Sequence, residues 1–308
     1  MKNLTIIVPC YNEELNVKPF YDEVTKYLTN ENYNFSILFV NDGSKDNTIK
    51  EVKKLREIDK RVKFINFSRN FGKEAAMYAG MEACKDEDAI IMIDADLQHP
   101  PHLIPEMIKN YEDGNKIVYT RQRTRKGDSK VRAFFAKTFY KIFNKYSDCR
   151  IEGSTKDYQL LDKMVVNAFL KLPDNNRFVK GIFSWVGYTK KCIEFDFVER
   201  EIGTTKWSFR SLFKYGVNGL NQFSNILIVM PILSGVFSFM WLAASVVLFI
   251  LEIFSLETFL VSMMITSLFI VMSMLFYFGF YILYQIRRQV LNRPIYLAEE
   301  TREDVRIN

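Results

Sequence analysis

Residues 90–101 read IIMIDADLQHPP, in which an apolar run ends in two aspartates, Asp94 and Asp96. Residues i and i+2 of a strand share a face, so these two carboxylates are expected to converge on one point. Converging carboxylates repel each other unless a cation lies between them, and hard oxygen ligands favour Mg²⁺ or Mn²⁺. Gln98 adds a third oxygen. The pattern therefore predicts a divalent-cation site that bridges to substrate phosphates, against the alternative of a solvated acidic turn.

A third carboxylate, Asp42, follows another apolar run, FSILFVN, and precedes Gly43. A carboxylate at a strand end can accept hydrogen bonds from a nucleobase or a ribose. The alternative role, capping the next helix, suits Asp46 or Asn47 better, because they lie directly before TIKEV. We therefore interpret Asp42 as a candidate nucleoside contact.

The elements that must position these carboxylates alternate along the first hundred residues. Strands are predicted over 4–9, 35–40, 62–68 and 89–96, and helices over 17–28, 48–58 and 73–84. This alternation is typical of βαβ units and a mainly parallel sheet, the Rossmann-like α/β class. Ligands of such sheets bind outside the carboxyl ends of the strands, where Asp42, Asp94 and Asp96 fall.

The C-terminal third has a different composition. Between Asn225 and Ile286 the only charged residues are Glu252 and Glu257. The uncharged stretches on either side, 226–251 and 258–286, each exceed the roughly 20 residues that a membrane-spanning helix needs. They predict a transmembrane hairpin, against the alternative of two buried core helices. Lys and Arg flank the hairpin but are absent from its loop, which places both chain termini in the cytoplasm.

Two further segments, 129–146 and 208–223, have helical periodicity with one apolar and one basic face. The first could equally be a core helix, whereas the second lies directly before the hairpin and is expected at the membrane interface. The chain thus divides into a domain over 1–207, an interfacial helix over 208–224, a membrane part over 225–286 and a cytoplasmic tail over 287–308. Four scattered cysteines indicate reduced thiols, not a disulfide or zinc framework.

Five motifs carry a resemblance, in this order: VPCYNEE, VNDGSKDNT, SRNFGKEAA, DADLQHPP and IGTTKW. Together they resemble the family-two glycosyltransferases of GT-A fold. With the two-helix tail, they are most similar to bacterial polyprenyl-phosphate glycosyltransferases of the GtrB type, and dolichol-phosphate mannose synthase is a more distant relative. Thr204 and Thr205 stand where many relatives have Glu–Ser. The QxxRW motif of processive synthases is absent, which favours transfer of a single sugar.

The resemblance implies a role for each matching residue. The donor sugar nucleotide would contact Pro9, Tyr11, Glu13, Asp42, Lys73, Asp94, Arg200 and Lys206. The cation would be held by Asp94, Asp96 and Gln98, and the catalytic residues would be Asp96 and Asp157. Asp157 could be a general base or could orient the acceptor, because a phosphate monoester is already largely dianionic at neutral pH. The basic segment 121–132 could bind the acceptor phosphate through Arg121, Arg123, Arg125 and Arg132, or lie against anionic headgroups.

These expectations combine into one function. The chain would be a membrane-anchored inverting glycosyltransferase that moves one hexose onto undecaprenyl phosphate at the cytoplasmic face of a bacterial inner membrane. UDP-glucose is the preferred donor, and UDP-N-acetylglucosamine, UDP-galactose and GDP-mannose are the alternatives. Small residues in the hairpin favour a homo-oligomer, for which a tetramer is plausible. A membrane-bound sugar-nucleotide sensor is the non-enzymatic alternative. No nucleic-acid recognition motif is present.

Overall fold

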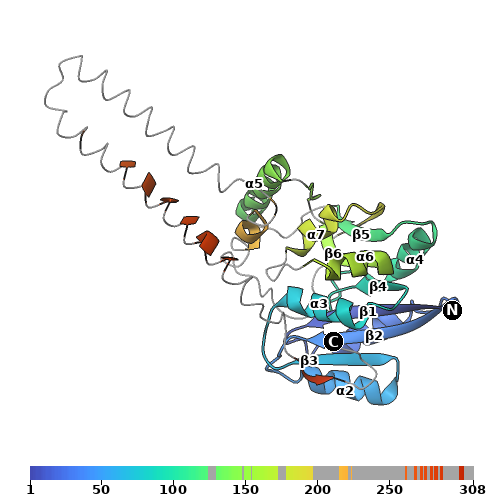
Figure 1. Cartoon of the computed structure of the whole chain (residues 1–308). Helices are drawn as coiled ribbons and strands as arrows, with labels where there is room; N and C mark the ends of the chain where they lie inside the picture. The colour runs from blue at the N-terminus through green and yellow to red at the C-terminus, as the bar shows by residue number, and fades with distance from the viewer. Residues whose placement is uncertain are drawn as a thin grey trace.

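The computed structural model describes residues 1–123, 130–147, 149–153, 155–172, 178–196, 215–220, 223 and 298–301, with a set of helical positions between 261 and 286. Within these ranges the core is one mixed sheet whose strands follow the order β7-β5-β6-β4-β1-β2-β3-β8 (Figure 1). The strands are β1 (Lys2–Cys10), β2 (Tyr33–Asn41), β3 (Val62–Phe67), β4 (Ala89–Met92), β5 (Ile117–Gln122), β6 (Thr155–Asp162), β7 (Lys190–Phe195) and β8 (Ala298–Thr301). The helices are α1 (Val17–Thr25), α2 (Thr48–Ile58), α3 (Lys73–Ala83), α4 (Ile104–Glu112), α5 (Lys130–Tyr146), α6 (Lys163–Leu170) and α7 (Val179–Trp185), with a 3₁₀ turn over Pro101–Leu103.

The first four strands form the parallel part of the sheet, as their alternation with helices predicts. β1 pairs in parallel with β2 and β4, and β2 pairs in parallel with β3. Their carboxyl ends therefore meet at one edge. The loops that follow them carry the residues of the candidate site.

The second half of the sheet departs from the mainly parallel expectation. β6 lies between β4 and β5 and runs antiparallel to both, whereas β5 and β7 are parallel. In the β4–β6 register, Met92 lies opposite Gln159. The start of β6, which includes Asp157, therefore lies beside the carboxyl end of β4. The reversed strand is what brings the second half of the chain into the site.

Helices cover both faces of the sheet, as Figure 1 shows for α3, α6 and α7 on one of them. Buried side chains of α1, α2 and α4 pack on the opposite face. The α3 helix approaches β1 very closely at Gly80, where an added Cβ would lie 2.4 Å from the Ile7 side chain. Burial of these two apolar faces is the main favourable term for the fold.

A smaller aromatic cluster joins α5 to the segment before the predicted membrane part. Phe143 of α5 is fully buried against Phe178, and Tyr215 lies 4.9 Å from Phe178 between ring centroids. The amphipathic helix expected over 129–146 is present as α5, although Phe135 is 48% exposed. The cluster packs the short helical stretch 215–220 against α5 and against Phe178, which directly precedes α7.

Of the predicted hairpin, the stretch 226–251 lies outside the described residues, and about half of the positions in 258–286 are described, all of them helical. In the part of the chain that the structure describes, no helix is long and apolar enough to cross a membrane. The tail after the hairpin contributes β8, which pairs antiparallel with β3. A strand here was not predicted, because its sequence, AEET, carries no β pattern.

Candidate active site

The loops after β1 and β2 are tied together by side-chain hydrogen bonds. The backbone N–H of Asn12 donates to Oγ of Ser44 at 2.8 Å, and that of Glu13 donates to Oγ1 of Thr48 at 2.8 Å. In return, the N–H of Lys45 donates to Oδ1 of Asn12 at 2.8 Å. Asn12 takes a left-handed conformation, φ 53°, which Asn tolerates better than most residues. The VPCYNEE and VNDGSKDNT motifs thus form one rigid rim.

Asp42 lies under this rim and is almost fully buried, with 3% exposure. Its carboxylate accepts hydrogen bonds from the N–H groups of Phe71 and Gly72, at 2.7 and 2.9 Å, and from Nδ2 of Asn70 at 2.9 Å. Burial raises the pKa of Asp42 to about 6, although the two backbone donors oppose the rise. Both oxygens thus hold the loop that leads into α3.

The loops after β2 and β3 approach each other too closely for a side chain at Gly43. A Cβ there would lie 2.2 Å from the carbonyl carbon of Arg69, and Gly43 also has a positive φ of 62°. Only glycine satisfies both conditions without displacing backbone. The glycine of the VNDGS motif is therefore explained by loop packing alone.

Asp94 and Asp96 lie at the end of β4, but not on the strand itself. The strand ends at Met92, and the two aspartates occupy the turn that follows. Leu97 has a positive φ of 56°, and the N–H of Gln98 donates to Oδ1 of Asp96 at 3.2 Å. The expected strand over 89–96 is therefore too long, and the shared-face argument does not describe how the pair is arranged. A strained turn presents these side chains instead.

Lys73, the first residue of α3, bridges two carboxylates from different parts of the chain. Its Nζ lies 2.7 Å from Oδ1 of Asp94 and 2.7 Å from Oδ2 of Asp157. The three side chains are only about a quarter exposed, at 27%, 26% and 25%. Burial alone would lower the pKa of Lys73, but the two carboxylates raise it well above its usual range. The ammonium therefore stays charged and joins Asp94, a residue of the predicted cation site, to Asp157.

The carboxyl of Asp157 is held ionised by the same bridge. Burial alone would raise its pKa, but the charges of Lys73 and Lys180 outweigh that effect and hold it well below the usual range. A carboxylate in this state is a weak base and a strong electrostatic partner.

His99 is the unexplained polar group of the site. It is 5% exposed and stacked on Tyr158, and its Nδ1 has no hydrogen-bond partner. That nitrogen lies 3.8 Å from Oδ2 of Asp94, and burial lowers the pKa of the ring. A buried nitrogen without a hydrogen-bond partner beside Asp94 fits a site completed by a bound group. Within the described residues, no cluster of three His, Cys, Asp or Glu side chains could hold a metal alone. The carboxylate and amide oxygens of Asp94, Asp96 and Gln98 are the kind of ligand that Mg²⁺ or Mn²⁺ takes together with oxygens of substrate phosphates.

Two of the four basic residues predicted for the acceptor phosphate, Arg121 and Arg123, form ion pairs with carboxylates. Arg121 forms ion pairs with Glu194 and, through Nη1 at 3.2 Å, with Glu152. Arg123 lies 3.6 Å from Glu194 and 3.4 Å from Asp196. Each of these two charges thus already has carboxylate partners.

The other predicted positions are placed as follows. Pro9 lies near the end of β1 opposite Val40 of β2, and Tyr11 and Glu13 are partly exposed in the rim loop. Arg125, Arg200 and Lys206 lie outside the described residues, as does the side chain of Arg132 on α5.

One partly buried acid beside the site was not predicted from the sequence. Glu74 follows Lys73 on α3, accepts a hydrogen bond from the Tyr215 hydroxyl and lies 3.5 Å from the backbone N of Val179. Burial raises its pKa to about 7. An acid among the small apolar residues of EAAMYAG was the available signal.

Comparison with known proteins decides the family. The profile of glycosyl transferase family 2 matches residues 5–170 of the 308-residue chain. The chain belongs to glycosyl transferase family 2. This glycosyltransferase is 45% identical over 234 residues to the putative glycosyltransferase CsbB of Bacillus subtilis (strain 168), covering 76% of this chain and 70% of CsbB.

Two further relatives have more specific names. A prophage bactoprenol glucosyl transferase homolog of Escherichia coli (strain K12) is 37% identical over 221 residues, 72% of each chain. The bactoprenol glucosyl transferase of Shigella phage SfV is 36% identical over the same length, again 72% of each chain. The resemblance deduced from the five motifs is confirmed, and so is the GT-A, α/β class that it implied.

Proposed function

We propose that this glycosyltransferase moves one hexose, glucose from UDP-glucose, onto a polyprenyl phosphate at the cytoplasmic face of a bacterial inner membrane. One observation carries the proposal: Lys73 bridges Asp94 and Asp157. We propose that Asp94 belongs to the site for the cation and the donor diphosphate, and that Asp157 lies on the acceptor side. The relatives named bactoprenol glucosyl transferases supply the acceptor class and the sugar.

Asp94, Asp96 and Gln98 are the residues that would hold the divalent cation, either Mg²⁺ or Mn²⁺. When bound, such a cation neutralises charge on the diphosphate leaving group. Arg200 and Lys206 remain the proposed protein partners of that diphosphate, following the motif REIGTTKW.

The reaction requires no proton acceptor of its own. An oxygen of the acceptor phosphate forms a bond to C1 of the sugar while the bond from C1 to the diphosphate oxygen breaks, and the nucleoside diphosphate leaves with that electron pair. In-line attack inverts C1. Since the attacking phosphate is largely dianionic at neutral pH, the chain must align it and screen the negative charges that meet. Lys73 and Asp157 supply a fixed pair of charges for that purpose.

Two features support the membrane anchor. Described helical positions between 261 and 286 carry large apolar side chains that are 41% to 63% exposed, including Leu268, Ile282 and Leu283. β8, which follows the predicted hairpin, pairs with β3, which precedes it, and this pairing supports a hairpin whose two ends lie on the same side of the membrane. An even number of spans requires that arrangement. We propose two membrane helices, cytoplasmic termini and a homo-oligomer that packs through the hairpin.

Transfer by the full-length protein in liposomes tests the function. The protein is incubated with undecaprenyl phosphate, Mg²⁺ or Mn²⁺, and labelled UDP-glucose, UDP-N-acetylglucosamine, UDP-galactose or GDP-mannose in separate reactions. We expect label in the lipid fraction with UDP-glucose. Label from another donor would correct the sugar, and label from none of them would contradict the function. Native mass spectrometry in mild detergent tests the oligomer, which a monomeric mass would contradict.

A further inference from the structure

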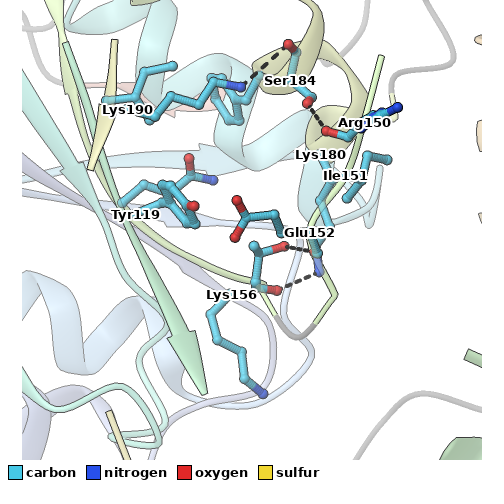
Figure 2. A pocket seen from close by; sticks show the side chains of 12 residues that line it. Tyr119, Arg150, Ile151, Glu152, Lys156, Lys180, Ser184 and Lys190 are labelled. Atoms are coloured by element: carbon cyan, nitrogen blue, oxygen red, sulfur yellow. Dashed lines mark hydrogen bonds between the residues drawn. The ribbon is translucent and has the colours of Figure 1, made fainter. Parts of the chain in front are cut away.

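A pocket lined by residues of β5, β6, α7 and β7 lies beside the part of β6 that holds Asp157. Its lining includes Tyr119 of β5, Gln159 of β6 and Phe183 of α7, and Figure 2 shows Tyr119 beside Glu152. Thr155 and Gln159, two residues before and after Asp157 on β6, both line it. The pocket thus opens next to the acceptor-side carboxylate.

The charged side chains that line the pocket are mostly basic. They are Arg150, Lys156, Lys180 and Lys190, with Glu152 as the one acid among them. Figure 2 shows the Glu152 carboxylate in the middle of the pocket, between Tyr119 and Lys180, with Lys190 on the other side of the opening. A solvent-filled recess with this excess of positive charge favours an anionic occupant.

Lys180 and Lys190 have no carboxylate within ion-pair distance in the part of the chain that the structure describes. Nζ of Lys180 donates to the carbonyl oxygen of Thr155 at 3.0 Å, and Nζ of Lys190 donates to that of Ser184 at 3.4 Å. Partial burial lowers the pKa of Lys190, which is the expected result for a cation that lacks a close counter-charge. Arg121 and Arg123 differ, because carboxylates already pair with them.

We propose that this pocket is the subsite for the phosphate of the acceptor, and that Lys180 and Lys190 are the side chains that bind it. The inference rests on the proposed transfer to a lipid phosphate. Lys180 is central, since its charge also acts on Asp157. The apolar wall of Ile151 and Phe183 suits the hydrocarbon next to the phosphate.

Glu152 has the opposite role in this subsite. Its carboxylate lies among the basic residues and is held by Arg121 Nη1 at 3.2 Å. An incoming phosphate is repelled by that carboxylate or must displace it. Removing its charge therefore strengthens phosphate binding.

The test uses full-length protein in mild detergent and a water-soluble, short-chain isoprenyl monophosphate as acceptor. Because a charge-assisted hydrogen bond is lost, Lys180→Met should raise the acceptor KM about tenfold or more, and Lys190→Met roughly threefold or more. The donor KM should change by less than about twofold, and Lys180→Arg should restore most of the acceptor affinity. Glu152→Gln should lower the acceptor KM.

Lys191→Met is the matched control, because Lys191 neighbours Lys190 on β7, is exposed and does not line the pocket. An unchanged acceptor KM in Lys180→Met, or an equal rise in Lys191→Met, would overturn the subsite. Calorimetric binding of the isoprenyl monophosphate to wild type and Lys180→Met decides the subsite without turnover. A wild-type protein that binds this phosphate through Lys180 but transfers no sugar would contradict the proposed function and leave the subsite standing.

Discussion

Lys73 and Asp157 are 84 positions apart in the chain, yet Nζ of Lys73 lies 2.7 Å from Oδ2 of Asp157. The same ammonium contacts Asp94, so one lysine compensates the carboxylates on both sides of the site. Asp157 is therefore ionised and engaged before any acceptor arrives. Of the two roles that the sequence left open, this arrangement favours orientation and electrostatics over proton removal.

The first prediction concerns the pH dependence of Asp157→Asn. If Asp157 is not a base, the variant should lose rate by a constant factor, roughly 100-fold, across pH 6–9. Both proteins should gain rate only as the acceptor phosphate loses its second proton near pH 6. Initial rates at saturating donor measure this. A wild-type profile with an added ionisation that Asp157→Asn lacks would restore the general-base role.

A second prediction follows from the bridge itself. Lys73→Met leaves the carboxylates of Asp94 and Asp157 without the cation between them. Because these side chains are about three-quarters buried, the substitution should lower the free energy of unfolding by roughly 2–3 kcal/mol. Adding Mn²⁺ should raise the thermal unfolding midpoint of this variant more than that of wild type. Lys18→Met is the control: its ion pair with Asp22 is about half exposed, so its loss should be below about 1 kcal/mol. Equal midpoints for the two variants would contradict the compensating role.

The cation site gives a third prediction. Excess chelator should abolish transfer, and Asp96→Asn should do so with an unchanged unfolding midpoint, since one of two carboxylate ligands is lost. Titration of Mn²⁺ into the nucleotide-bound protein, followed by electron paramagnetic resonance, should show weaker binding in the variant. Full activity in chelator would remove the metal from the reaction.

The sequence predicted the secondary structure well where it depends on the local pattern of apolar and polar residues. The strands and helices of residues 1–100 follow the alternation of apolar runs and amphipathic segments, and the motifs fall in the loops at the carboxyl edge. The end of β4 was misplaced because Ile93 and Ala95, on either side of Asp94, extend the apolar pattern beyond Met92, where the strand ends before the turn at Leu97. A positive φ at a leucine has no sequence signal.

Contacts between distant segments could not be predicted. The Lys73–Asp157 pair depends on β6 entering the sheet antiparallel beside β4, and nothing local to Thr155–Asp162 specifies that partner. Arg121 was predicted to bind the acceptor phosphate, and its ion pair was not foreseen. Its partner Glu194 lies on the neighbouring strand β7, but 73 positions away along the chain. Sheet order, which is a property of the whole fold, determines both.

The fourth prediction is a pH effect on stability at Asp42. Burial raises its pKa to about 6, above the model-peptide value of 3.8, so the folded state binds this proton more tightly than the unfolded state does. Its contribution to stability is present below about pH 4 and is lost as the pH rises to about 6. Asp42→Asn should not show this loss of stability, because asparagine does not ionise. The stability of wild type minus that of the variant should therefore fall by on the order of 2 kcal/mol between pH 4 and 7. A difference that is flat with pH would contradict the assignment.

The last prediction tests the link between the active-site helix and the segment before the membrane part. Tyr215→Phe removes the hydroxyl that donates to the buried carboxylate of Glu74, whose pKa burial already raises to about 7. With one donor fewer, the ionised form of Glu74 is less favourable and its pKa should rise further. Folding stability should therefore fall more steeply above pH 7 in the variant, with a loss of about 1–2 kcal/mol at pH 8 and less at pH 6. Thermal unfolding of the full-length protein at both pH values measures the difference. Tyr146→Phe, at a tyrosine that is 40% exposed on α5, should change neither midpoint. A loss in Tyr215→Phe that is the same at pH 6 and pH 8 would contradict a hydroxyl that preferentially stabilises the ionised form of Glu74.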